Sequence, residues 1–355
     1  MDTTMEESKQ DNQIEGSAQK KEKEQPEEKS YVTSATPPWH TVAILVLVAS
    51  YYIREIETSL ETIDEAATVT TFSKRLFPNL LSIAYLGWIR LALAMFVWAI
   101  TIYLALSPEG DLLGSFYLPG SKLQSTSFRA RGLKTLTPFT VWSWILLGIG
   151  FTMSATIALM VAHNGSAKTF EHDSTGDITS AVVFSPWFLR IALIVWELGA
   201  ANSILTSIVV TYGIWPLLLQ EGVDTAELKN PITLVMHNIN AMLSMTEVCL
   251  LGGLPVRWDD IAFAPLFGIV YLLFSWYMMD KWTTPDKGPQ FLYFFMDTTL
   301  GLLSSISLLV VFVVLQGAYG LFVVLHRLLD QVEGGLVVHG LAVLVVCALV
   351  GRFRD

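Results

Sequence analysis

The segment that decides the fold is residues 231–253, PITLVMHNINAMLSMTEVCLLGG. It is apolar enough to lie in a bilayer, yet its polar residues step by four, three, four and three: Thr233, His237, Asn240, Ser244 and Glu247. On an α-helix these positions fall within an arc of about 80°. The pattern therefore predicts a membrane helix with one polar face. Ionisable groups inside a membrane generally mark a functional cavity, although Ser, Thr, Asn and His also join neighbouring helices.

The composition of the chain indicates a membrane protein. Of its 355 residues, 52% are hydrophobic and only 15% are charged, and the mean hydropathy is +0.50. Because backbone groups in a bilayer must be satisfied internally, this predicts an all-α polytopic transmembrane helical bundle. The chain has no basic patch for nucleic acid. Cys249 and Cys347 both lie in apolar segments, which argues against a disulfide framework or a thiolate metal site.

Hydropathy divides the chain into membrane spans and links. Six segments are predicted to span the membrane: residues 79–106, 139–162, 187–219, 231–253, 261–279 and 291–325. Weaker apolar segments lie at 39–53 and 336–350, both shorter than the ~20 residues that cross the hydrocarbon core. Residues 54–75 are polar and predict a separate amphipathic surface helix. The predicted domains are a tail (1–36), a link (37–78), the bundle (79–326) and a C-terminal short helix with its tail (327–355).

The charge distribution predicts the orientation. Residues 1–30 contain nine acidic residues and five lysines, and we expect this tail to be disordered. If all eight segments cross, the tail, the 107–138 loop and the C-terminus share one side. That side is richer in basic residues: Lys122, Arg129, Arg131, Lys134, Arg352 and Arg354. The positive-inside rule then places both termini in the cytosol, in the endoplasmic reticulum or the plasma membrane.

Candidate catalytic groups lie in two places, and none belongs to a soluble-enzyme motif. His237 is the only histidine in the middle of a predicted span, and an imidazole can act as a base at neutral pH. Three threonines lie near the start of the 139–162 helix: Thr135, Thr137 and Thr140. Thr137 before Pro138 is typical of a helix N-cap, and the same position brings a hydroxyl to free backbone N–H groups that could bind an oxyanion. Both interpretations stay open.

Three stretches resemble the androgen-induced membrane protein family. They are GLKTLTPF at residues 132–139, Met236-His237 with Glu247 ten residues on, and YLLFSW at residues 271–276 followed by Gly288 and Phe291-Leu292. The resemblance implies a multi-pass hydrolase of fatty acid esters of hydroxy fatty acids, taking its lipid substrate from the bilayer without a cofactor or metal. It implies Thr137 as the nucleophile and His237 as the base. Since Pro138 departs from the family pattern, Thr135 and Thr140 are the alternative nucleophiles.

The remaining polar residues allow other hypotheses. Asn240, Ser244 and Glu247 are expected to line the same cavity as His237. An ion- or proton-coupled transporter would instead use a relay of Arg90, Glu197, Glu247, Asp297 and His237, but no inverted repeat is evident. A non-enzymatic membrane regulator would dock through the acidic tail. Glu171-His172-Asp173 could ligate a metal, although a solvated turn is the commoner role of such a cluster.

Overall fold

The computed structural model describes residues 32, 34–107, 111–114, 118–124, 126–168, 184–220, 222, 224–331 and 335–353. Within these ranges the regular secondary structure is helical apart from one antiparallel pair of short strands, β1 (Asp111–Gly114) and β2 (Ser127–Ala130). The prediction of an all-α polytopic membrane bundle is confirmed. The Glu171-His172-Asp173 cluster and nearly all of the acidic tail lie outside the described residues.

Five helical segments of the described chain are long and apolar enough to cross a membrane: Ile83–Leu106, Phe139–Asn164, Pro186–Gln220, Trp258–Met278 and Leu302–Asp330. They match five of the six predicted spans. The sixth, at 231–253, is helical as α7 (Pro231–Leu234), the π-helical turn η4 (Val235–Ile239) and α8 (Asn240–Leu250). Its polar face makes it less apolar than the other five.

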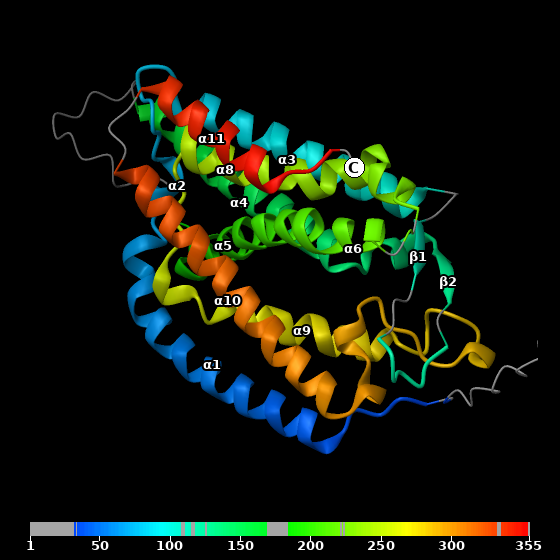
Figure 1. Ribbon diagram of the computed structural model, residues 1–355. Helices are drawn as coiled ribbons and strands as arrows, with labels where there is room; N and C mark the ends of the chain where they lie inside the picture. The colour runs from blue at the N-terminus through cyan, green and yellow to red at the C-terminus, as the bar shows by residue number, and fades with distance from the viewer. Residues whose placement is uncertain are drawn as a thin grey trace, which may run out of the picture.

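The elements follow one another in the chain as α1 (Trp39–Ala66), α2 (Val69–Ser73), α3 (Ile83–Leu106), η1 (Gly132–Leu136), α4 (Phe139–Lys168), α5 (Pro186–Ile208), the π-helical η2 (Val209–Ile214), α6 (Trp215–Gln220), η3 (Ala226–Lys229), the segment α7–η4–α8, η5 (Trp258–Asp260), α9 (Phe263–Met278), η6 (Pro285–Lys287), η7 (Phe294–Met296), η8 (Thr298–Leu300), α10 (Leu302–Asp330) and α11 (Leu336–Val350). Helices α3, α4, α5, α8 and α11 gather on one side of the molecule, and α1, α9 and α10 on the other (Figure 1). The strands, α6, the start of α1 and the C-terminus lie at one end of the bundle (Figure 1).

Two predicted boundaries were wrong. The apolar segment at 39–53 and the polar segment that follows it form one helix, α1. The polar half stays helical against the bundle because Ser59 donates to the buried Asp260 and Thr62 donates to Asp259. At the other boundary, α10 begins at Leu302, not at 291, because Asp297 caps η8 by accepting the Thr299 N–H at 2.8 Å.

Small residues set the distance between α4 and α5. A methyl group added at Gly199 would meet the backbone of Leu147 at 2.9 Å, and one added at Gly150 would meet the backbone of Trp196 at 3.2 Å. Close backbone approach of this kind is how membrane helices gain packing energy without a hydrophobic driving force between them. These contacts also show that the two helices run antiparallel, since the position in α5 rises as the position in α4 falls.

Candidate functional site

The polar face of α8 forms contacts between helices. The Asn240 amide donates to the hydroxyl of Ser143 in α4 at 3.4 Å, and the hydroxyl of Ser244 shares a hydrogen bond with Ser203 in α5 at 2.6 Å. Asn240 and Ser244 are both completely buried. These two residues therefore join α8 to its neighbours, which is the second of the two roles that the sequence allowed.

Glu247 is held in a buried ion pair. Its carboxylate receives two hydrogen bonds from Arg90 of α3, at 2.9 and 2.5 Å, and a third from the Gly252 N–H at 3.2 Å. Arg90 also donates to the carbonyl of Phe72 at 2.5 Å, and both charged side chains are fully buried. A buried pair needs this degree of hydrogen bonding to offset the loss of hydration. The pair links the C-terminal end of α8 to α3, and the bond from Arg90 to the Phe72 carbonyl extends this link to α2.

The other residues of the predicted relay lie in separate contacts. Glu197 accepts the backbone N–H of Arg257 and the hydroxyl of Tyr319, both at 2.9 Å. Asp297 caps η8. Among the described residues no hydrogen bond links either carboxylate to Glu247 or His237, so the structure does not bring the five relay residues into one chain of contacts.

His237 lies in the π-helical turn η4 and its side chain is partly buried. Its backbone carbonyl accepts a hydrogen bond from Ser207 of α5. In the described part of the chain, no residue forms a hydrogen bond with its imidazole. Single π-helical turns are often found at functional sites, because they place one side chain out of helical register. Within the described residues, the imidazole of His237 thus takes no part in the hydrogen bonds that join the α7–η4–α8 segment to its neighbours, unlike Asn240, Ser244 and Glu247.

The register of the helices places His237 at the level of Thr140. Helix α8 runs antiparallel to α5, because Ser203 meets Ser244 while Ser207 meets His237. Since α4 is also antiparallel to α5, α4 and α8 run in the same direction. The Asn240–Ser143 contact fixes their register. Thr140 and His237 each precede that contact by three residues, which is about one helical turn.

The three predicted threonines differ in what their hydroxyls do. Thr135 donates to the carbonyls of Leu104, at 3.1 Å, and Gly132, at 2.7 Å. Thr137 follows η1 and donates to the carbonyl of Lys134 at 2.5 Å, and among the described residues no N–H donates to its hydroxyl. Thr140 lies in the wall of a cavity. Thr140 is therefore the threonine that the structure exposes to a ligand-sized space.

Two tyrosines complete the N-terminal end of α4, and the sequence reasoning missed both. The Phe139 N–H donates to the Tyr293 hydroxyl at 3.2 Å, and the Tyr271 hydroxyl donates to the Thr137 carbonyl at 2.9 Å. Tyr293 also interacts with Tyr271 and with Thr140. Burial raises the pKa of the Tyr293 phenol, in the link between α9 and α10, so it stays neutral at neutral pH. Tyr271 does fall within the YLLFSW motif, but nothing in the sequence pairs it with Thr137.

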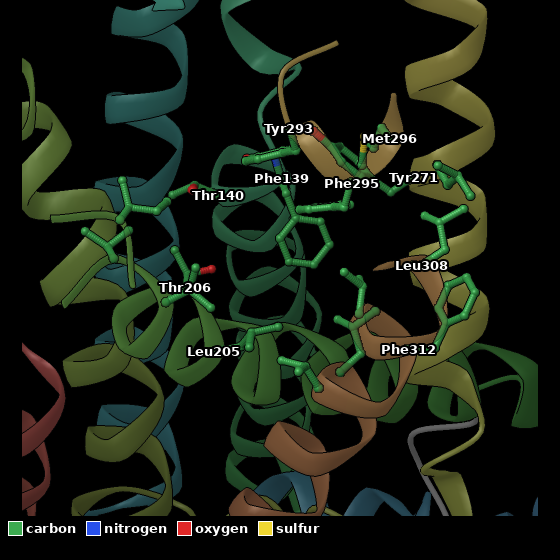
Figure 2. A pocket seen from close by; sticks show the side chains of 18 residues that line it. Phe139, Thr140, Leu205, Thr206, Tyr271, Tyr293, Phe295, Met296, Leu308 and Phe312 are labelled. Atoms are coloured by element: carbon green, nitrogen blue, oxygen red, sulfur yellow. The ribbon is translucent and has the colours of Figure 1, made fainter. Parts of the chain in front are cut away.

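The cavity has a volume of about 140 Å³ and an almost entirely apolar wall. It is lined by residues of α4, α5, η2, α9, α10 and the α9–α10 link, and Figure 2 shows Thr140, Tyr293 and Phe139 at one end and Leu205 and Phe312 at the other. Two of the wall residues, Val209 of η2 and Val314 of α10, are 39% and 44% exposed, so the wall reaches the surface of the bundle at these two elements. Of the seven predicted site residues, Thr140 alone lines this cavity; Asn240, Ser244 and Glu247 do not.

Comparison with protein-family models, curated proteins and solved structures finds no match to this chain. The resemblance stated on the sequence motifs therefore stays a prediction. Across the described residues, no group of three His, Cys, Asp or Glu side chains is close enough to hold a metal ion. The apolar cavity therefore ends at the hydroxyl groups of Thr140 and Tyr293, and the imidazole of His237 lies at the same level of the bundle.

Proposed function

We propose that the protein hydrolyses lipid esters within the membrane. The observation that carries this proposal is that the apolar cavity ends at Thr140 and Tyr293, at the N-terminus of α4. An acyl chain entering between η2 and α10 would leave its ester at these hydroxyl groups. Exclusion of water there strengthens hydrogen bonds to a developing oxyanion.

The reaction assigns a role to each group. The hydroxyl oxygen of Thr137 or Thr140 attacks the ester carbonyl while its proton passes to His237. The tetrahedral intermediate then expels the hydroxy-acid alkoxide, which takes the proton from His237, and water hydrolyses the acyl-threonine. The neutral phenol of Tyr293 accepts the Phe139 N–H and keeps its own proton available to the oxyanion. The resemblance favours Thr137 and the cavity wall favours Thr140.

Hydrolysis of a branched fatty acid ester of a hydroxy fatty acid tests the proposal. We expect membranes carrying His237→Ala to lose activity, and either Thr137→Ala or Thr140→Ala to lose it too. Thr156→Ala, on the exposed face of α4, is the matched control and should keep full activity. Full activity in His237→Ala, or in both threonine variants, would remove the proposed mechanism.

We also propose that both termini face the cytosol, in the endoplasmic reticulum or the plasma membrane. This rests on the basic residues Lys122, Arg131, Lys134 and Arg352 in the loops and tail that the positive-inside rule assigns to the cytosol, and Figure 1 shows the C-terminus at the same end of the bundle as the strands and α6. A protease-cleavable tag at either terminus should be cut from the cytosolic side of intact cells after selective permeabilisation of the plasma membrane. Protection of both tags under those conditions would reverse the orientation.

A further inference from the structure

A second pocket lies at the opposite end of α10. It has a volume of about 330 Å³ and is lined by residues of η5, including Trp258 and Asp259, and by residues near the C-terminus of α10, including Arg327 and Asp330. Arg327 is fifteen residues beyond Phe312 of the apolar cavity, or about 22 Å along the helix. The pocket is therefore separate from the site of the proposed hydrolysis, and it is polar where the cavity is apolar.

The pocket contains guanidinium groups suited to an anion. Arg327 is exposed, and within the described ranges it forms no ion pair with a carboxylate. Arg257 is largely buried: its Nη2 pairs with Asp259 at 3.1 Å, and its Nη1, which forms no hydrogen bond, lies 3.4 Å from a carboxylate oxygen of Asp260. Planar guanidinium groups bind phosphate oxygens with directed hydrogen bonds, and are preferred to ammonium groups for this purpose.

The same pocket contains groups suited to a cation. The Trp258 side chain is 49% exposed, although its ring packs against Gly320 of α10, where an added methyl group would lie 3.1 Å from it. Asp259 and Asp330 are more than half exposed, and among the described residues the ion-pair partner of Asp330 is Lys74, at 3.8 Å. An indole face beside carboxylates is the arrangement that recognises quaternary ammonium groups.

The position of the pocket favours a lipid over a free metabolite. It lies where two membrane spans end, Trp258–Met278 at its first residue and Leu302–Asp330 at its last. Tryptophan is enriched at this depth because the headgroup region accommodates an amphipathic ring. We propose that this pocket binds the phosphocholine headgroup of a bilayer lipid. The phosphate lies on Arg327 and Arg257, and the trimethylammonium group lies on Trp258 between Asp259 and Asp330.

Binding of short-chain lipids to the full-length protein in detergent tests this proposal. Native mass spectrometry gives the Kd of dihexanoyl phosphatidylcholine for wild type, Trp258→Leu and Arg327→Gln. We expect each variant to raise the Kd about tenfold, and Trp258→Phe to restore most of the affinity. Trp88→Leu changes a tryptophan of α3 that is 60% exposed outside the pocket, and should bind as wild type does.

Three outcomes would overturn the proposal. The first is an unchanged Kd in both Trp258→Leu and Arg327→Gln. The second is wild-type affinity for dihexanoyl phosphatidylglycerol or inorganic phosphate equal to that for phosphatidylcholine, which would mean that the pocket selects an anion only. The third is an equal loss of affinity in Trp88→Leu, which would place the lipid elsewhere. Thermal unfolding without lipid identifies misfolded variants, and Asp330→Asn, at an exposed carboxylate of the same pocket, then replaces them in the same comparison.

Discussion

The polar face of α8 and the wall of the apolar cavity are opposites in composition and in use. Asn240, Ser244 and Glu247 make the α8 face polar, and all three are buried in contacts with neighbouring helices. The cavity wall is almost entirely apolar, and its few hydroxyl groups include Thr140 and Tyr293. In this protein, the polar residues along α8 mark the hydrogen bonds and ion pair that join the helices. The space for a ligand lies instead where the helices pack incompletely.

The largest expected effect comes from breaking the buried ion pair between Glu247 on the α8 face and Arg90. Glu247→Ala leaves Arg90 charged, buried and without its carboxylate, which should destabilise the protein by about 3–5 kcal/mol. Thermal or denaturant unfolding in detergent measures this loss. The ion pair of Arg190 with the exposed Asp64, at 2.5 Å, is the matched control. Equal destabilisation by Asp64→Ala would contradict the central place given to the buried pair.

A side chain that displaces the same ion pair without removing either charge should lower the free energy of unfolding by a smaller amount. A methyl group at Gly252 would lie 2.0 Å from Arg90 Nη2 and 2.7 Å from Glu247 Oε1, so Gly252→Ala must displace the pair, at a cost of about 1–3 kcal/mol. Gly317→Ala in α10 meets no atom within 4 Å and should be neutral or stabilising. If the unfolding curves of Gly252→Ala and Gly317→Ala coincide, the Arg90–Glu247 pair can be displaced without loss of stability.

The third prediction fills the cavity and leaves the α8 face intact. Val311 of α10 lines the cavity, whereas Val313, two residues on, is 67% exposed on the outside of the bundle. Val311→Phe should lower kcat/KM for lipid-ester hydrolysis about tenfold by occupying the acyl-chain space, a loss of ~1.4 kcal/mol in transition-state binding. Val313→Phe should leave kcat/KM unchanged. Equal activity of the two variants would separate the cavity from the reaction.

The smallest effect concerns the surface pair that served as the control. The hydrogen bond from Arg190 lowers the pKa of the Asp64 carboxyl below its ordinary value. The contribution of the pair to folding stability is therefore fully present above the ordinary carboxyl pKa, and it is lost as the pH falls through the lowered value. Unfolding of Asp64→Asn and wild type should differ slightly at neutral pH and coincide in acid. A difference in unfolding free energy that grows as the pH falls would contradict the lowered pKa of Asp64.

Hydropathy and periodicity predict the fold well, because membrane burial imposes both on the sequence. Five predicted spans and the polar segment at 231–253 are helices. The helix expected at 54–75 does form, but its continuity with the 39–53 segment was missed, because the partners that hold it against the bundle, Asp259 and Asp260, lie about 200 residues away.

The candidate site is less predictable for a related reason. The Tyr293 hydroxyl that binds the Phe139 N–H comes from 154 residues further along the chain, and no local pattern encodes that contact. The N-cap interpretation of Thr137 is not realised among the described residues: no N–H donates to its hydroxyl, which itself donates to the Lys134 carbonyl in the preceding turn. Periodicity identified which face of α8 is polar, but whether that face met a cavity or another helix depended on packing.

The central claim is that a hydroxyl at the N-terminus of α4 is made nucleophilic by His237. Labelling of the full-length protein in membranes with an alkyl fluorophosphonate, followed by peptide mass spectrometry, tests it most directly. We expect a single phosphonylated residue, Thr137 or Thr140, and no labelling in His237→Ala. A label on a residue outside the 135–140 segment, or one that persists in His237→Ala, would contradict it.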